Sequence, residues 1–188
     1  TYNAMDEIWN SLSGVIQAMA LAVLISTVVL FLFLGDVRAS LIIGTSMPIA
    51  LLVTLIVMSF TGMTFNMLSL GGLSIGVGMM VDNSIVVLDS CFKKRDERRS
   101  FKDAAIEGAG LVTSAVAAST LTTVVVFLPI SLMEGISGQM FKDAGFTVVY
   151  SLIASLVSAL TLVPLLFFKF QPKEKKENLF ARGLHKVE

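Results

Sequence analysis

GGLSIGVGMMVDNSIVVLDS, the stretch from Gly71 to Ser90, is apolar almost throughout, yet it carries Asp82 near its middle, with Asn83 beside it and Asp89 two turns later. Its length matches the roughly 20 residues that an α-helix needs to cross the hydrocarbon core of a bilayer. An ionisable side chain in such a helix is costly to insert, so it usually faces a bundle interior or a water cavity. The stretch therefore predicts a membrane-spanning helix with a functional carboxylate.

The composition of the whole chain agrees with a membrane protein. Of its 188 residues, 55% are hydrophobic and only 15% are charged, and the mean hydropathy is +0.83. Soluble domains usually carry about a quarter charged residues. The single cysteine, Cys91, excludes a disulfide within these residues. The chain begins at Thr1 without a charged or cleavable leader pattern, so we expect no signal peptide and interpret the chain as a fragment.

Five apolar stretches are long enough to span a bilayer, and they predict an all-α, polytopic membrane helix bundle. The charged segment 92–107 between the third and fourth stretch predicts a cytoplasmic surface helix. Residues 1–13 are expected to lie outside the bundle, and 169–188 to form a polar tail, as a linker or an interfacial helix. The predicted five-helix domain covers 14–168, with spans at 14–34, 40–60, 66–91, 110–133 and 145–168.

The basic residues predict the orientation of the bundle. Of the 14 Lys and Arg residues, one is Arg38, six lie between 92 and 107, and six lie from Lys169 onward, so only Lys142 falls on the opposite side. Cytoplasmic loops of membrane proteins are enriched in Lys and Arg. We therefore expect the C-terminus in the cytoplasm and the N-terminus outside.

Helical spacing defines what surrounds Asp82. The residues at three, four, seven, eight and eleven positions before it share its side of the helix, and they are small, apolar or weakly polar: Met79, Gly78, Ile75, Ser74 and Gly71. Desolvation favours a protonated carboxyl and a nearby cation favours an ionised one, so the two together permit reversible protonation. The structural alternative is a neutral Asp82 that hydrogen-bonds a neighbouring Ser or Thr and holds helices together.

Four glycines on the same helix, Gly71, Gly72, Gly76 and Gly78, predict close packing with another helix. Gly72 and Gly76 form a GxxxG pattern, which lets two membrane helices approach closely but is common in apolar helices. Asp89 shares the side of Asp82 but lies near the cytoplasmic end, where it can reach water or a basic partner. Asp89 therefore has both a functional and a merely solvated interpretation.

The stretch around VDNSIVVLDS closely resembles the fourth transmembrane helix of the resistance-nodulation-division efflux pumps of the hydrophobe and amphiphile multidrug class. FLFLGDVRASLIIGTSMPIALL is similar to the end of their second helix, a short loop and their third helix, whose proline is Pro48 here. The segment from ASTLTTVVVFLPISLMEGISG to SALTLVPLL is similar to their fifth and sixth helices. The resemblance covers nearly the whole chain.

The resemblance implies a proton relay on this helix. In the drug pumps, two adjacent aspartates of the fourth helix take up and release protons, facing a lysine on the tenth helix. Asp82 matches the first aspartate, Asn83 stands in place of the second, and Asp89 stands where a glutamate is usual. The chain therefore offers one evident proton carrier, and the lysine has no counterpart within it.

Complete members of the family carry a second set of transmembrane helices and large extracytoplasmic porter domains, and act as homotrimers in the bacterial inner membrane. Residues 1–13 resemble the end of a porter segment. The resemblance therefore implies membrane lipid, the rest of the transporter and an amphiphilic drug as partners, with an adaptor and an outer-membrane channel as further candidates. The fragment alone is not expected to transport.

Other functions remain as alternatives. A lipid-binding, sterol-sensing-like five-helix module has corresponding helices, and a protein-export accessory subunit shares the helical repeat. The ten methionines show no spacing that favours the heavy-metal branch of the family. No phosphate-binding glycine loop, nucleophile motif or metal-ligand cluster occurs, so we expect no cofactor, no metal site, no nucleic acid and no enzyme activity. Either a proton or a sodium gradient is compatible with the sequence as the energy source.

Overall fold

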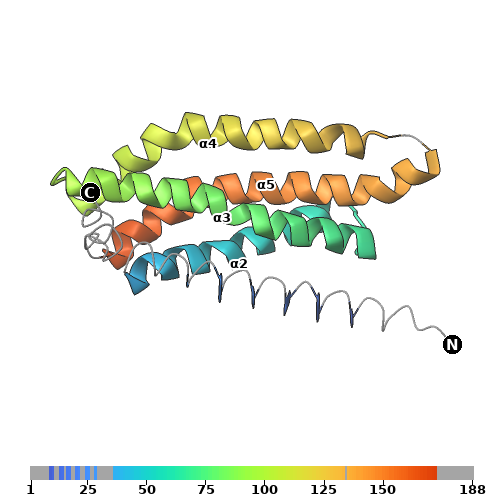
Figure 1. Cartoon of the computed structure of the whole chain (residues 1–188), viewed down its shortest axis with the longest axis horizontal. Coiled ribbons are helices and arrows are strands. Elements are labelled where there is room, and N and C mark those ends of the chain that lie inside the picture. The colour runs from blue at the N-terminus through green and yellow to red at the C-terminus, as the bar shows by residue number, and fades with distance from the viewer. Residues whose placement is uncertain are drawn as a thin grey trace, which may run out of the picture.

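The computed structural model describes residues 36–133 and 135–172, together with scattered positions between Trp9 and Val28. The described part is helical and contains no strand. Its long helices form an elongated bundle (Figure 1), and they are α2 (Val37–Phe60), α3 (Met67–Asp96), α4 (Phe101–Ser131) and α5 (Gly135–Phe170). The predicted span at 14–34 falls mostly outside the described residues, and segments 1–13 and 173–188 are not described beyond isolated positions.

All four helices are long and apolar enough to cross a membrane. The prediction of an all-α membrane bundle is therefore confirmed for these four spans. Each helix extends beyond the predicted apolar stretch at one end at least. The clearest cases are α5, which begins ten residues before the predicted start at 145, and α4, which begins nine residues before the predicted start at 110. Hydropathy marks the lipid-facing length of a helix, whereas its ends are set by capping and by continued backbone hydrogen bonding.

The prediction of a separate surface helix at 92–107 is wrong. Residues up to Asp96 continue α3, and residues from Phe101 onward already belong to α4, so only a short turn separates the two helices. The physical reason is that charged side chains are solvated where a helix leaves the bilayer, so the charged residues continue α3 and begin α4 and do not form a helix of their own. Lys93, Lys94 and Arg95 lie in the last turn of α3, where positive charge is favourable next to the exposed carbonyl groups.

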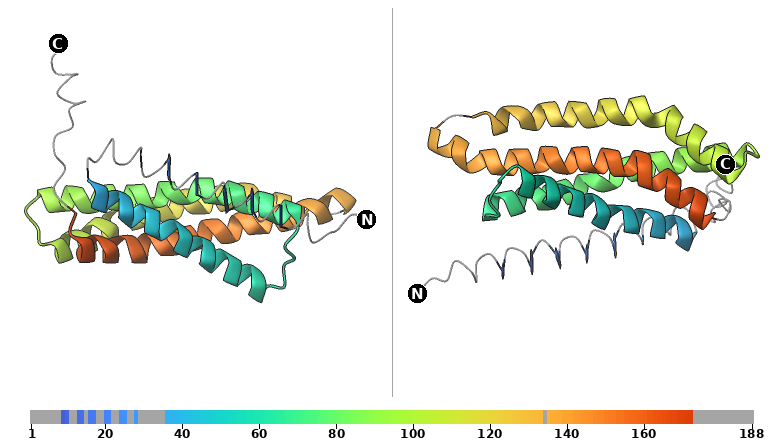
Figure 2. Two further views of the ribbon diagram at one scale, coloured as in Figure 1. Left: turned by 90° about the horizontal axis from the view of Figure 1, so that it is seen from below. Right: turned by 180° about the vertical axis from the view of Figure 1, so that it is seen from behind.

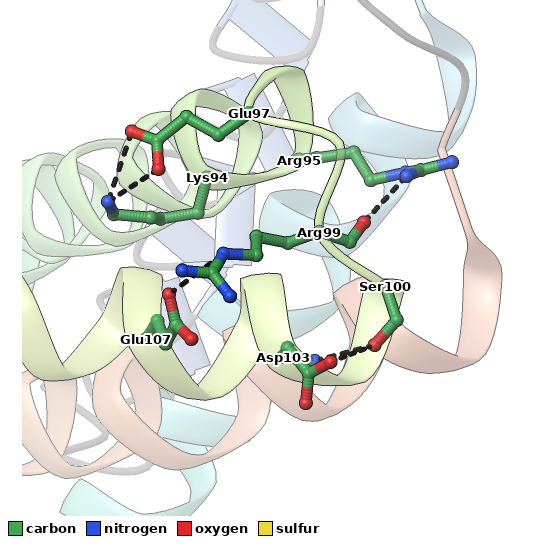
Figure 3. Close-up of polar contacts among 7 residues, drawn as sticks. All are labelled: Lys94, Arg95, Glu97, Arg99, Ser100, Asp103 and Glu107. Carbon is green, nitrogen blue, oxygen red and sulfur yellow. Dashed lines mark hydrogen bonds and ion pairs between the residues drawn. The ribbon is translucent and has the colours of Figure 1, made fainter.

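Local interactions close this turn (Figure 3). Arg98 adopts a left-handed backbone conformation with φ of 62°, which reverses the chain. Ser100 then caps α4, since its hydroxyl oxygen accepts a hydrogen bond from the Asp103 N–H at 3.1 Å. The turn is therefore specified by the left-handed conformation of Arg98, which follows the end of α3, and by the Ser100 cap, which begins α4.

Helices α3 and α5 lie at the centre of the packing, because each of them contacts all three of the other long helices described. Figure 2 shows α5 running along one side of α3, with α2 and α4 flanking the pair. Gly72 of α3 lies against the backbone of Ala144, and Gly76 lies against Ser151, both on α5. The GxxxG pattern thus faces α5, and glycine permits this approach because it has no Cβ.

The two ends of the bundle differ in charge. The Arg38 Nη1 atom donates to the carbonyls of Phe170 and Gln171 at 3.2 and 3.3 Å, which ties the start of α2 to the end of α5. The turn between α3 and α4 lies at this same end, which therefore gathers all described Lys and Arg residues except Lys142. At the opposite end, Asn66 donates through Nδ2 to Asp143 Oδ2 at 2.7 Å.

Candidate functional site

Asp82 lies near the middle of α3, about 22 Å along the helix axis from Met67 and about 16 Å from Lys93. Its side chain is exposed in the described bundle. Exposed positions recur along the same side of α3 at helical spacing, at Gly71, Ile75 and Val86 among others. Helix α5 covers the other side of α3 (Figures 1 and 2), so Asp82 belongs to a continuous face of α3 that the described helices leave uncovered, which we call the uncovered face.

The residues next to Asp82 are held by hydrogen bonds from three different helices. The Met80 carbonyl accepts a hydrogen bond from the Ser155 hydroxyl of α5 at 3.0 Å. Asn83 Nδ2 donates to Thr120 Oγ1 of α4 at 3.2 Å. The Ser84 hydroxyl lies 3.3 Å from the Ser46 hydroxyl of α2. We call these three contacts the polar collar.

The neighbours of Asp82 in sequence take part in the polar collar, whereas Asp82 itself does not. It anchors α3 immediately before and after Asp82, while the Asp82 carboxylate points to the uncovered face. Among the residues that the structure describes, the Asp82 carboxylate makes no hydrogen bond or ion pair. The structural alternative, in which Asp82 holds helices together, requires a hydrogen bond between Asp82 and a neighbouring serine or threonine. No described serine or threonine makes such a hydrogen bond.

Asn83 is directed differently from Asp82, although the two are adjacent. It is partly buried between α3 and α4, and the Thr120 hydroxyl also lies 3.4 Å from its Oδ1 atom. A carboxylate in this position would lose the hydrogen bond that the Asn83 amide donates to Thr120. The arrangement therefore suits the neutral amide that the sequence carries here.

Asp89 lies at the charged end of α3. Its Oδ2 atom forms an ion pair at 2.7 Å with Lys93, one turn further along the helix, and its side chain is 34% exposed. Such a pair on one helix is typical of the region where a helix meets water, and it contributes little to stability. The structure therefore places Asp89 about two turns from Asp82 and outside the polar collar.

The glycines of α3 divide between its two faces. Gly72 and Gly76 meet α5, as described above, whereas a Cβ atom at Gly71 or Gly78 would have no atom within 4 Å. Gly71 and Gly78 lie on the same uncovered face as Asp82. Their lack of side chains leaves room beside the carboxylate for a close neighbour from outside the described bundle.

Reasoning from the sequence did not single out Thr120, Ser46 or Ser155, which build the polar collar. Each is a hydroxyl residue within an apolar span, and each is buried. Hydroxyl residues in membrane helices often hydrogen-bond across helices, so a serine or threonine within an apolar span is the sequence feature that could indicate such contacts. Many other serines and threonines of these helices bond only to their own helix, as Thr122 does with the Ala118 carbonyl.

We expect Thr120→Val to lower the free energy of unfolding by about 0.6 to 1.7 kcal/mol, the range found for hydrogen bonds between membrane helices. The substitution keeps the shape of the side chain but leaves Asn83 without its partner on α4. Unfolding of the purified protein in a detergent titration would measure the change. Thr122→Val is the matched control, because its exposed hydroxyl bonds only within α4. Equal effects of the two substitutions would contradict the role given to the polar collar.

The apolar helices, with a carboxylate at mid-span between residues anchored to three other helices, define the class: this is a helical segment of a polytopic membrane protein. The chain belongs to the AcrB/AcrD/AcrF family, whose model matches residues 1–187. This match confirms the resemblance to resistance-nodulation-division transporters that the sequence motifs indicated.

Individual relatives agree with the family assignment. The chain is 33% identical over 173 residues to the swarming motility protein SwrC of Bacillus subtilis, covering 88% of this chain and 16% of that protein. It is 34% identical over 180 residues to the multidrug resistance protein MdtC of Yersinia enterocolitica, covering 94% and 17%. For MdtC of Pectobacterium carotovorum, the identity is 35% over 156 residues, covering 83% and 15%. The chain thus spans about one sixth of the length of these curated relatives.

Proposed function

We propose that the chain is the part of a proton-driven multidrug efflux transporter that carries the proton-binding helix. The observation that carries the proposal is the position of Asp82, at the middle of α3 and on its uncovered face, between residues anchored to α2, α4 and α5. An ionised carboxylate facing lipid at this depth would cost about 3 kcal/mol or more. A covering partner or a water-filled path is therefore needed beside it.

The proposed partner is a cationic side chain on the second helical half of the same transporter. When Asp82 is ionised, its charge pairs with this cation across the face that Gly71 and Gly78 leave open. When a proton arrives from the outer side, the carboxylate becomes a neutral acid, the pair loses its attraction, and the two halves shift. The proton must bind one conformation better than the other, and a charge that is paired in only one of them provides this difference.

The hydrogen bonds that anchor α3 determine which helices move when the two halves shift. Because the polar collar joins α3 to α2, α4 and α5, a displacement of Asp82 moves the described helices together rather than one helix alone. We propose that this motion reaches porter domains elsewhere in the full-length protein, which bind and expel an amphiphilic drug. Return of the proton to the cytoplasm then restores the ionised Asp82.

Three lines support the finer parts of this proposal. Relatives of this chain are named multidrug resistance proteins. The gathering of basic residues at one end of the bundle favours a cytoplasmic location for that end, and hence an outer location for the end that carries Asn66 and Asp143. A homotrimer in the inner membrane, joined by an adaptor and an outer-membrane channel, is the assembly that the family resemblance implies.

The proposal is tested with the full-length protein reconstituted in vesicles with an acidic interior. We expect that adding an amphiphilic cationic drug outside accelerates the loss of the pH gradient, because each exported drug molecule is exchanged for protons. The same measurement with a sodium gradient and no pH gradient is the control for the coupling ion. The protein-export alternative would be favoured by two results together: drugs leave the pH gradient of the vesicles unchanged, and cells that lack the protein secrete proteins poorly.

A further inference from the structure

An apolar groove lies between α4 and α5 at the charged end of the bundle, away from Asp82. Its volume is about 430 Å³, within the range of small-molecule sites in proteins. Ala105 and Pro164 are its less exposed lining residues, while the other apolar lining residues, Ile106, Leu165 and Phe168, are exposed. The groove is therefore open to the surroundings of the helices.

The sequence explains why space remains here. Ala105 is small, and Pro164 cannot donate a backbone hydrogen bond to the carbonyl one turn before it, which disturbs α5 at this level. The groove lies within about two helical turns of the start of α4 at Phe101 and of the end of α5 at Phe170. It therefore sits where the apolar spans end and the charged residues begin, at the depth of lipid headgroups.

One cation borders the groove, and nearby acids are already engaged. Asp103 accepts a hydrogen bond from the Ser100 hydroxyl at 2.6 Å, and Glu107 lies 3.6 Å from Arg99 Nε, as Figure 3 shows. Lys102 is exposed and lines the groove, and it makes no ion pair or hydrogen bond with any described residue. An apolar groove with an unpaired ammonium at its headgroup end is complementary to an acyl chain that carries an anionic headgroup.

We propose that this groove binds one anionic membrane phospholipid, with an acyl chain against Ile106, Pro164 and Leu165 and the phosphate near Lys102. The basic end of the bundle draws anionic lipids towards the groove, and Lys102 then selects among them. A single lysine near the membrane surface contributes about 1 kcal/mol to such selection. This inference is independent of proton transport, since the groove is lined by residues of α4 and α5, whereas Asp82 lies on α3.

The test uses the full-length protein with Ile106 replaced by the photoreactive residue p-benzoylphenylalanine. The protein is reconstituted in vesicles of three parts phosphatidylethanolamine and one part phosphatidylglycerol, illuminated, and its lipid adducts are counted by mass spectrometry. We expect phosphatidylglycerol adducts to be enriched about fivefold over their share of the bilayer, which corresponds to about 1 kcal/mol. Lys102→Gln should abolish this enrichment and Lys102→Arg should retain it.

The same photoreactive residue at Leu111 is the matched control, since Leu111 is exposed on α4 but does not line the groove. Its adducts should follow the bulk lipid ratio. Bulk-ratio adducts at position 106 would overturn the proposal, because the groove would then be ordinary lipid-facing surface. Crosslinks from position 106 to protein alone would also overturn it, because another segment would then occupy the groove.

Discussion

Asp82→Asn in the full-length protein is expected to reduce drug efflux to the level of cells that lack the transporter. Asparagine has nearly the shape of aspartate but cannot take up and release a proton, so α3 keeps its packing while the proposed coupling is lost. Because the exposed Asp82 carboxylate makes no hydrogen bond or ion pair with the described residues, the substitution should leave the bundle intact. Drug susceptibility of cells that express equal amounts of both proteins measures the effect.

The control for this substitution is Asp96→Asn. Asp96 also lies on α3 and is exposed, but it stands in the last turn, beyond the apolar span. Loss of efflux should be confined to Asp82→Asn, with expression of both variants near normal. If the Asp82→Asn variant retained efflux, the proposed role of Asp82 as a proton carrier would be contradicted. A fall in expression of this variant would instead indicate that Asp82 supports folding.

Gly72→Val is expected to destabilise the protein by on the order of 2 kcal/mol or more, the largest stability effect we predict from a single substitution. A Cβ at Gly72 would lie 2.5 Å from the Ala144 carbonyl oxygen and 3.0 Å from its Cα, both of them backbone atoms. Backbone atoms within a helix cannot turn aside as the end of a flexible side chain can. Valine at this position therefore forces α3 and α5 apart.

Thermal unfolding in detergent, followed by the loss of monodisperse protein, would measure this destabilisation. Gly110→Val is the matched control, since it makes the same change within a helix and its Cβ would have no atom within 4 Å. Both variants carry the same small change in helix propensity, so their difference reports the contact between α3 and α5. Equal midpoints for the two variants would show that α3 and α5 do not pack in the described way.

These two predictions concern different sides of one helix. Gly72 faces α5 and supports the packed side, whereas Asp82 faces outward and supports the proposed transport. Efflux should therefore fail in Gly72→Val because the bundle is weakened, and in Asp82→Asn although the bundle is sound. Measuring stability and efflux on both variants separates the two causes.

Several features followed from the sequence alone: the membrane class, the helical fold, the approximate positions of the four described spans, and the central position of Asp82 in one of them. These features depend on hydropathy and on helical periodicity, which are local properties of a chain in a bilayer. The family also followed from long local motifs. The charged segment 92–107 was misjudged because polarity marks the membrane boundary and does not mark the end of a helix.

Only the packed structure decided which neighbour each face of α3 meets. Gly72 and Gly76 are four residues apart and Gly71 and Gly78 are seven apart, but neither spacing tells which helix the glycines meet; only the structure places Gly72 against α5 and Gly71 on the uncovered side. The partners of Met80, Asn83 and Ser84 come from three helices distant in sequence, and a hydroxyl group within a span can bond equally well to its own helix. Hydropathy fixes how deep a residue lies in the membrane, but the side to which it points depends on close packing between helices, which is a property of the whole bundle.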